Sequence, residues 1–199
     1  MPDSQVLRYE GQREYVVRLD GLRWSLPVVK IRPHTWIASN ASLILGDVAF
    51  VSKAAELLGK RVRSRGVEAI LTAEAKSIAL AYELSKELGI ERFAVARKSL
   101  KAYMGKYASQ KVSSITTKTE QELLLTDEEI RWLSGRKVCL LDDVVSTGAT
   151  LRALEALAER AGAVVGCKAA VWKEGPWYKA RDLIYIQTLP VFTDGAGTV

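Results

Sequence analysis

The stretch from Val138 to Leu151, VCLLDDVVSTGATL, decides the fold and carries the most chemistry. Its apolar first half predicts a buried strand that ends in two adjacent carboxylates, Asp142 and Asp143. A loop rich in hydroxyls and glycine follows and leads directly into a helical pattern over about 150–161. A strand, a polar loop and a helix in this order are typical of α/β proteins, in which ligands bind beyond the carboxyl ends of the strands.

The same alternation of strand and helix runs through most of the chain. Helices are predicted at about 47–62 and 77–88, and Thr126 with Glu129 forms a capping-box pattern for a short helix. Further strands are predicted at 67–73, 92–98, 112–117, 122–126, 164–171 and 182–189. We therefore expect one α/β domain over 1–199, with a mostly parallel sheet covered by helices on both faces. Residues 1–46 would add a small appendage containing a β-hairpin around Asp20-Gly21.

Composition excludes several classes of protein. The 199 residues are 48% hydrophobic and 26% charged, which is typical of a soluble globular domain. No apolar run approaches the roughly 20 residues of a membrane span, and the first residues contain no signal-peptide core, so we expect a cytoplasmic protein. Cys139 and Cys167 lie in strand-like runs and are expected to be buried, reduced thiols. His34 has no Cys, Asp or Glu cluster near it, so no dedicated metal site is predicted.

The net charge of +6 is concentrated in one segment. Residues 92–119 hold seven basic residues and no acidic one, and the rest of the chain has 22 basic against 23 acidic residues. Nucleic-acid-binding proteins usually spread positive charge over a face or along a helix, so nucleic acid is not the expected partner. A local basic segment suits a compact polyanion such as a phosphate or a pyrophosphate.

The loop after Asp143 has the composition of an anion-binding loop. The hydroxyls of Ser146, Thr147 and Thr150, with the backbone N–H groups around Gly148, would surround a phosphate at the start of the helix. Adjacent carboxylates would accept hydrogen bonds from vicinal sugar hydroxyls. A turn with an ordinary helix cap is the simpler alternative, but a cap needs one polar residue and this loop has two acids, three hydroxyls and a glycine.

The segment LLDDVVSTGATL resembles the phosphoribosyl pyrophosphate (PRPP) binding signature of type I phosphoribosyltransferases. The resemblance implies that Asp142 and Asp143 bind the ribose hydroxyls. It also implies a loop for the 5-phosphate, with these residues in or beside it: Val145, Ser146, Thr147, Gly148, Ala149 and Thr150.

Two more segments, LTAEAKSIALAYELSKELG and FAVARKSLK, are similar to the adenine and xanthine enzymes of the purine branch, and the likeness spans roughly 46–192. It implies a pyrophosphate loop made of Glu74, Ala75, Lys76 and Ser77. Arg97 and Lys98 would reach the diphosphate, and Mg²⁺ would arrive bound to it. Residues 101–114 match the position of a flexible catalytic loop, which places Tyr103 and Lys106 among the catalytic candidates.

Base recognition is the least specific part of the resemblance. Val144, Trp172 and Lys173 are the candidates, and Lys173 aligns with a lysine that binds the 6-oxo group in xanthine-type relatives. Lys173 as a solvent-facing side chain beside Glu174 is an equal alternative. The tryptophans are also expected in the core or at a subunit interface more often than against a base. By analogy, the N-terminal residues and the C-terminal segment would form a hood over the base.

The resemblance implies an enzyme of purine salvage that transfers the phosphoribosyl group from PRPP to adenine or a 6-oxopurine, acting as a homodimer. Two alternatives share the PRPP signature. One is a non-catalytic regulator that senses PRPP and binds nucleic acid or a partner protein, although the first 46 or so residues show no helix-turn-helix pattern. The other is a pyrimidine or orotate enzyme. The sequence determines neither the base nor the size of the oligomer.

Overall fold

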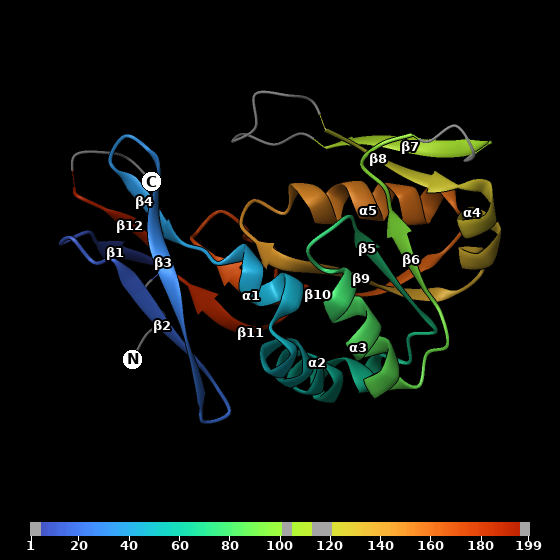
Figure 1. The fold of residues 1–199 in the computed structure, drawn as a ribbon. Helices are drawn as coiled ribbons and strands as arrows, with labels where there is room; N and C mark the ends of the chain where they lie inside the picture. Colours follow the sequence, from blue (N-terminus) through green and yellow to red (C-terminus); the bar gives the residue numbers. More distant parts are fainter. Residues whose placement is uncertain (1–4, 101–104, 113–120, 196–199) are drawn as a thin grey trace.

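The fold is built on two five-stranded sheets, seen in a computed structural model that describes residues 5–100, 105–112 and 121–195 (Figure 1). The core sheet has the strand order β11-β10-β9-β5-β6, and all of its neighbouring strands are parallel. Its strands are β5 (Ala69–Ala73), β6 (Phe93–Ala96), β9 (Lys137–Val145), β10 (Val164–Glu174) and β11 (Leu183–Leu189). The parallel α/β architecture predicted from the strand and helix alternation is confirmed.

Helices cover both faces of the core sheet. The helices α1 (Ala41–Gly46), α2 (Val48–Val62) and α3 (Ile78–Leu88) lie on one side, with the short η1 (Arg63–Arg65) after α2. On the other side α5 (Ala149–Arg160) packs on β5, β9 and β10, and α4 (Asp127–Leu133) lies beside it. Local sequence defines these helices well, because Asp47 caps α2, Gly89 ends α3 in a left-handed conformation, and Thr126 and Glu129 form the expected capping box of α4.

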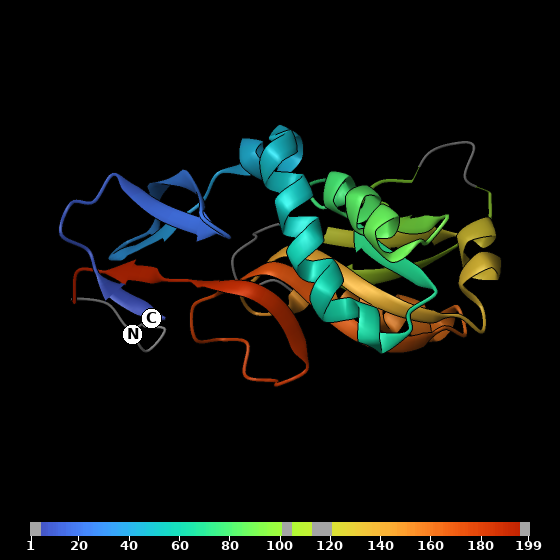
Figure 2. The same cartoon turned by 90° about the horizontal axis from the view of Figure 1, so that it is seen from below.

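The second sheet joins segments from the two ends of the chain. Its order is β1-β12-β4-β3-β2, with β1 (Val6–Arg8), β2 (Glu14–Leu19), β3 (Leu22–Arg32), β4 (Thr35–Ala38) and β12 (Val191–Thr193). The hairpin of β2 and β3 turns at Asp20 and Gly21, where φ is positive at both residues, as the turn requires. Figures 1 and 2 show this sheet beyond the carboxyl ends of β9, β10 and β11. The second sheet therefore lies next to the edge of the core sheet from which the loops after the parallel strands extend.

Part of the segment at 101–114, for which a flexible loop is expected, forms a strand. Tyr107–Val112 form β7, which pairs antiparallel with β8 (Gln121–Thr126) in a two-stranded sheet that contacts α5. The sequence instead places a strand at 112–117, most of which lies outside the described residues. Tertiary pairing with β8 and packing on α5 fix the strand at 107–112, although its own residues are largely polar.

Two apolar clusters fill the space on either side of the core sheet. One lies between the sheet, α2, α3 and the second sheet, and the other lies between the sheet, α5 and the β7–β8 pair. Cys139 and Cys167 are buried and free, as expected. None of the helices in the described part of the chain is long and apolar enough to cross a membrane.

Phe50 of α2 links the second sheet to the core. Its ring is fully buried, meets Trp24 of β3 edge-on at 5.2 Å between centroids, and stacks on Trp172 of β10, also at 5.2 Å. Removing this ring would leave a cavity with aromatic walls on two sides.

We therefore expect Phe50→Ala to lower the free energy of unfolding by about 3–5 kcal/mol, the usual cost of truncating a buried aromatic side chain. Urea denaturation followed by tryptophan fluorescence measures it. Lys60→Ala is the matched control in the same helix, because Lys60 is exposed and makes only a surface ion pair with Glu56, so its effect should stay within about 0.5 kcal/mol. Equal effects of the two substitutions would contradict the linking role of Phe50.

Candidate functional site

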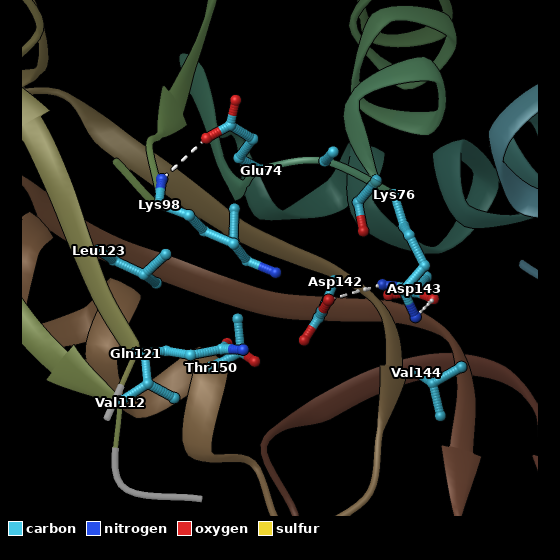
Figure 3. Close-up of a pocket in the computed structure, with 13 residues that line it drawn as sticks. Glu74, Lys76, Lys98, Val112, Gln121, Leu123, Asp142, Asp143, Val144 and Thr150 are labelled. Carbon is cyan, nitrogen blue, oxygen red and sulfur yellow. Dashed lines mark hydrogen bonds and ion pairs between the residues drawn. The ribbon is translucent and has the colours of Figure 1, made fainter. Parts of the chain in front are cut away.

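A polar cleft opens at the carboxyl ends of β5, β6 and β9 (Figure 3). Three segments of the core domain contribute to it: the loop after β5, Lys98 just after β6, and the end of β9 together with Thr150 in the first turn of α5. The β7–β8 pair closes one side through Val112, Gln121 and Leu123. Because the core strands are parallel, their carboxyl ends bring these loops to one edge of the sheet.

The two carboxylates of the β9 segment lie at the centre of the cleft. Lys76 Nζ donates to Asp143 Oδ2 at 2.9 Å, and Asp143 is only 6% exposed. The backbone N–H of Asp143 donates to Asp142 Oδ1 at 3.0 Å. Burial, reinforced by the neighbouring Asp143 carboxylate, raises the pKa of Asp142 well above its usual value. Both acids line the cleft, where their oxygens can accept hydrogen bonds from the hydroxyl groups of a ligand.

Lys76 compensates the charge of this acidic pair. Burial works against its ammonium group, but attraction by Asp143, with smaller contributions from Asp142 and Glu174, raises the pKa of Lys76. Lys76 therefore stays protonated in the cleft. Its charge balances the carboxylate of Asp143 and links the loop after β5 to the end of β9.

The loop after β5 also carries Glu74, which holds the end of β6 in place. Glu74 Oε2 accepts the backbone N–H of Lys98 at 2.8 Å, and Glu74 Oε1 lies 3.5 Å from Nε of Arg97. Figure 3 shows the side chain of Lys98, just beyond the end of β6, extending into the cleft. Ala75, Lys76 and Ser77 line the cleft beside Glu74, whereas Arg97 does not line it and is paired with Glu74.

The loop between β9 and α5 borders an adjoining cavity that includes every residue from Val144 to Thr150. Gly148, with a φ of +78°, is the N-cap of α5. The two spaces adjoin, because five residues line both of them: Val112, Gln121, Asp142, Val144 and Thr150. The sequence-predicted phosphate loop thus lies next to the acidic pair and the loop after β5.

Tyr178 supports the phosphate loop from outside, a contact that sequence analysis misses. A Cβ atom added at Gly148 would lie 2.5 Å from the Tyr178 ring, so only glycine fits there. Tyr178 donates its hydroxyl to Asp182 Oδ1 at 2.7 Å, and Lys168 binds both Asp182 and Glu155 of α5. Burial and the hydrogen bond to Asp182 raise the pKa of Tyr178 to about 12, so it remains a neutral donor.

A further cavity lies between the acidic pair and the second sheet. Leu26, Ile37 and Leu189 contribute apolar walls, and Lys76, Asp143 and Val144 line it as well as the polar cleft. We call it the second cavity. Trp172 and Glu174, both at the end of β10, complete the wall on the core side. The register of the sheet pairs Trp172 with Val144 and Lys173 with Val145.

Only two of the three predicted base-binding residues line the second cavity. Val144 and Trp172 both line the second cavity. Lys173 is half-buried between Trp172 and Glu174 on β10 and lines neither the second cavity nor the polar cleft. Glu174, which the sequence presents only as a neighbour of Lys173, does line the second cavity, and Trp172 stacks on Phe50.

The basic segment at 92–119 is only partly brought to the cleft. Lys98 lines the cleft, while Arg92 pairs with Glu128 and lies over the ring of Trp132. Lys106 is exposed just before β7. Tyr103 lies outside the described residues, so its catalytic role stays a prediction.

Comparison with known proteins agrees with this geometry. The family model described as "Phosphoribosyl transferase domain" matches residues 43–197. A hypoxanthine/guanine phosphoribosyltransferase of Methanothermobacter thermautotrophicus is 35% identical over 147 residues, covering 71% of this chain and 72% of the relative. One from Methanohalophilus mahii is 35% identical over 99 residues, 50% of this chain and 48% of that protein.

Solved structures show the same fold. The crystal structure of adenine phosphoribosyltransferase from Thermoanaerobacter pseudethanolicus has a TM-score of 0.67 and 20% identity, covering 82% of this chain and 95% of that one. The enzyme from Saccharomyces cerevisiae has a TM-score of 0.63 and 15% identity, covering 87% and 94%. With a family model that matches most of the chain and a signature loop seated beside an acidic pair, the chain belongs to the phosphoribosyltransferase family.

Proposed function

We propose that this phosphoribosyltransferase moves the 5-phosphoribosyl group of PRPP to a purine base, adenine or a 6-oxopurine, and releases pyrophosphate. The observation that carries the proposal is that three cavities adjoin one another. Asp142 and Thr150 line both the polar cleft and the cavity of the phosphate loop, and Lys76 and Asp143 line both the polar cleft and the second cavity. A ribose bound at the two acids would have its 5-phosphate in the loop at 145–150. Its diphosphate would then lie toward 74–77, and a base would enter from the second cavity.

The reaction requires a site that stabilises opposite charges at once. Departure of pyrophosphate from the anomeric carbon leaves positive charge on the ribose, as in glycoside chemistry. Asp142 and Asp143 would bind the ribose hydroxyls and stabilise that charge. Lys98 points into the cleft and would bind the leaving diphosphate, while Arg97, held by Glu74, would lie behind it.

Mg²⁺ fits this site as a companion of the diphosphate. The described residues contain no group of three or more His, Cys, Asp or Glu side chains that would hold an ion alone. Mg²⁺ commonly takes most of its ligands from water and substrate phosphates. Bound to the diphosphate, it would neutralise charge on the leaving group, and no side chain of this chain is assigned to it.

We also propose self-association and a cytoplasmic location. Leu45, Val48 and Tyr82 are exposed apolar side chains that line a cleft over α1, α2 and α3, a face that a second copy would cover. The free thiols of Cys139 and Cys167 are typical of a reducing compartment.

Turnover of one purine base is the first expected result. The protein is incubated with PRPP and Mg²⁺ against adenine, hypoxanthine, guanine, xanthine, uracil and orotate, and both nucleotide and pyrophosphate are measured. Asp142→Asn/Asp143→Asn should lose PRPP binding, because both proposed acceptors for the ribose hydroxyls are weakened. Exclusive turnover of orotate or uracil would contradict the purine assignment. PRPP binding without turnover of any base would indicate the regulatory alternative.

Lys173 gives a separate prediction about the base. If its ammonium group donates to a 6-oxo group, Lys173→Ala should raise the KM for hypoxanthine, guanine or xanthine about tenfold and leave the KM for PRPP unchanged. Steady-state kinetics with a 6-oxopurine and with adenine measures the difference. An unchanged KM would place Lys173 outside base recognition, in agreement with its position outside the second cavity.

Gly148→Ala tests the packing of the phosphate loop. We expect weaker PRPP binding, because the new methyl group would displace either the loop or the Tyr178 ring. Gly135→Ala is the matched control, since Gly135 has a similar φ of +75° but open space around its Cα. Both variants carry about 1–2 kcal/mol of left-handed backbone strain, so urea denaturation should show an additional loss only in Gly148→Ala. Equal stability and equal PRPP affinity in the two variants would refute the close contact with Tyr178.

A further inference from the structure

Glu174 is a buried acid that binds neither the ribose nor the diphosphate in the proposed transfer of the phosphoribosyl group. It is the last residue of β10, it is 8% exposed, and it lines the second cavity next to Trp172. Two acids line this cavity among the residues that the structure describes, Asp143 and Glu174. Asp143 is paired with Lys76, whereas Glu174 has no ion pair of that kind among the described contacts.

The surroundings of Glu174 keep it able to exchange a proton near neutral pH. Burial raises its pKa to about 6, and a hydrogen bond with Ser146 and the charge of Lys76 oppose that shift. The charge of Asp143 adds a smaller upward effect. Lys76 and Asp143 are the charged residues that share the cavity with it. At pH 7 the group is mostly a carboxylate, and its pKa is close enough to the working pH for efficient proton transfer.

The proposed reaction releases a proton at the base. A purine ring nitrogen that carries hydrogen must lose it when that nitrogen bonds to the anomeric carbon. The proton acceptor has to lie on the side of the site where the base enters, which is the second cavity. Asp142 and Asp143 are unsuited, because both are assigned to the ribose hydroxyls and one is neutralised by Lys76.

We propose that Glu174 accepts this proton from the purine. The nitrogen–carbon bond forms as the bond from the anomeric carbon to the pyrophosphate oxygen breaks, and pyrophosphate leaves with the electron pair. The proton on the ring nitrogen moves to the Glu174 carboxylate and later passes to solvent. This proposal rests on the proposed function, because it requires a purine in the second cavity.

The hydrogen bond to Ser146 gives the acid a fixed place. Ser146 belongs to the loop that would hold the 5-phosphate, so the same loop that positions the ribose also positions the carboxylate. A proton acceptor must lie within hydrogen-bond reach of the atom it deprotonates, and a tethered side chain meets that condition better than a mobile one.

Glu174→Gln tests the proposal, because glutamine keeps the shape and the hydrogen bond but takes up no proton. The measured quantity is the single-turnover rate of nucleotide formation between pH 5 and pH 8. In the wild type the rate should fall as the pH drops below about 6, since protonated Glu174 accepts no further proton. At pH 7.5 we expect the variant to be at least about 100-fold slower than the wild type. Its rate should show no decline near pH 6, and its KM for PRPP should be unchanged.

Two further variants separate this role from a structural one. Glu159→Gln makes the same substitution at an exposed position on α5 and should behave like the wild type. Glu174→Asp keeps a carboxylate and should recover part of the rate together with the acidic limb. If Glu174→Gln keeps the wild-type rate, or keeps the acidic limb while losing PRPP affinity, the proposal is wrong. A wild-type protein that turns over no purine would instead overturn the proposed function, and this proposal with it.

Discussion

The ion pair between Lys76 and Asp143 is the contact on which the arrangement of the site depends. It places the half-exposed side chain of Lys76 beside two adjacent acids, of which Asp143 is buried, so that a carboxylate there does not stand without a counter-charge. It also ties the loop after β5 to the end of β9. Because both loops leave parallel strands at the same edge, this one contact sets the distance between the proposed pyrophosphate and ribose subsites.

The sequence predicts the core sheet well because its signals are local. The apolar runs of β5, β9 and β10, and the caps of α2 and α4, lie within a few residues of the elements they define. It misses β1, β4 and β12, which have only three or four residues and exist through distant partners such as Val6 with Val191 and Val191 with Ile37. The strand β7 is missed for the same reason, because its pairing depends on β8 and its packing on α5.

In the candidate site, too, the sequence reveals the residues that belong to a local pattern and misses those that tertiary packing brings into place. The residues from Asp142 to Thr150 are contiguous, so a pattern of acids, hydroxyls and glycine is enough to find them. Glu174 and Tyr178 carry no such pattern: one looks like a solvated acid beside a lysine, and the other follows a Gly-Pro turn. Their importance comes from burial and from packing against the loop, which depend on how β10 and the following segment fold over α5 and the second sheet.

The strand order of the second sheet also affects how the protein folds during its synthesis. Its strand β12, at residues 191–193, lies between β1 and β4, so this strand separates two strands that are synthesised more than 150 residues earlier. Contacts between such distant residues form slowly. During synthesis, β1 and β4 therefore lack the strand that pairs with both of them until residues 191–193 have been made. Until then, the backbone edges of β1 and β4 that face β12 remain unpaired. The cavity that would take the base needs residues from Leu26 to Leu189, so its lining is synthesised completely only after the lining of the sites for ribose and phosphate, which ends at Thr150.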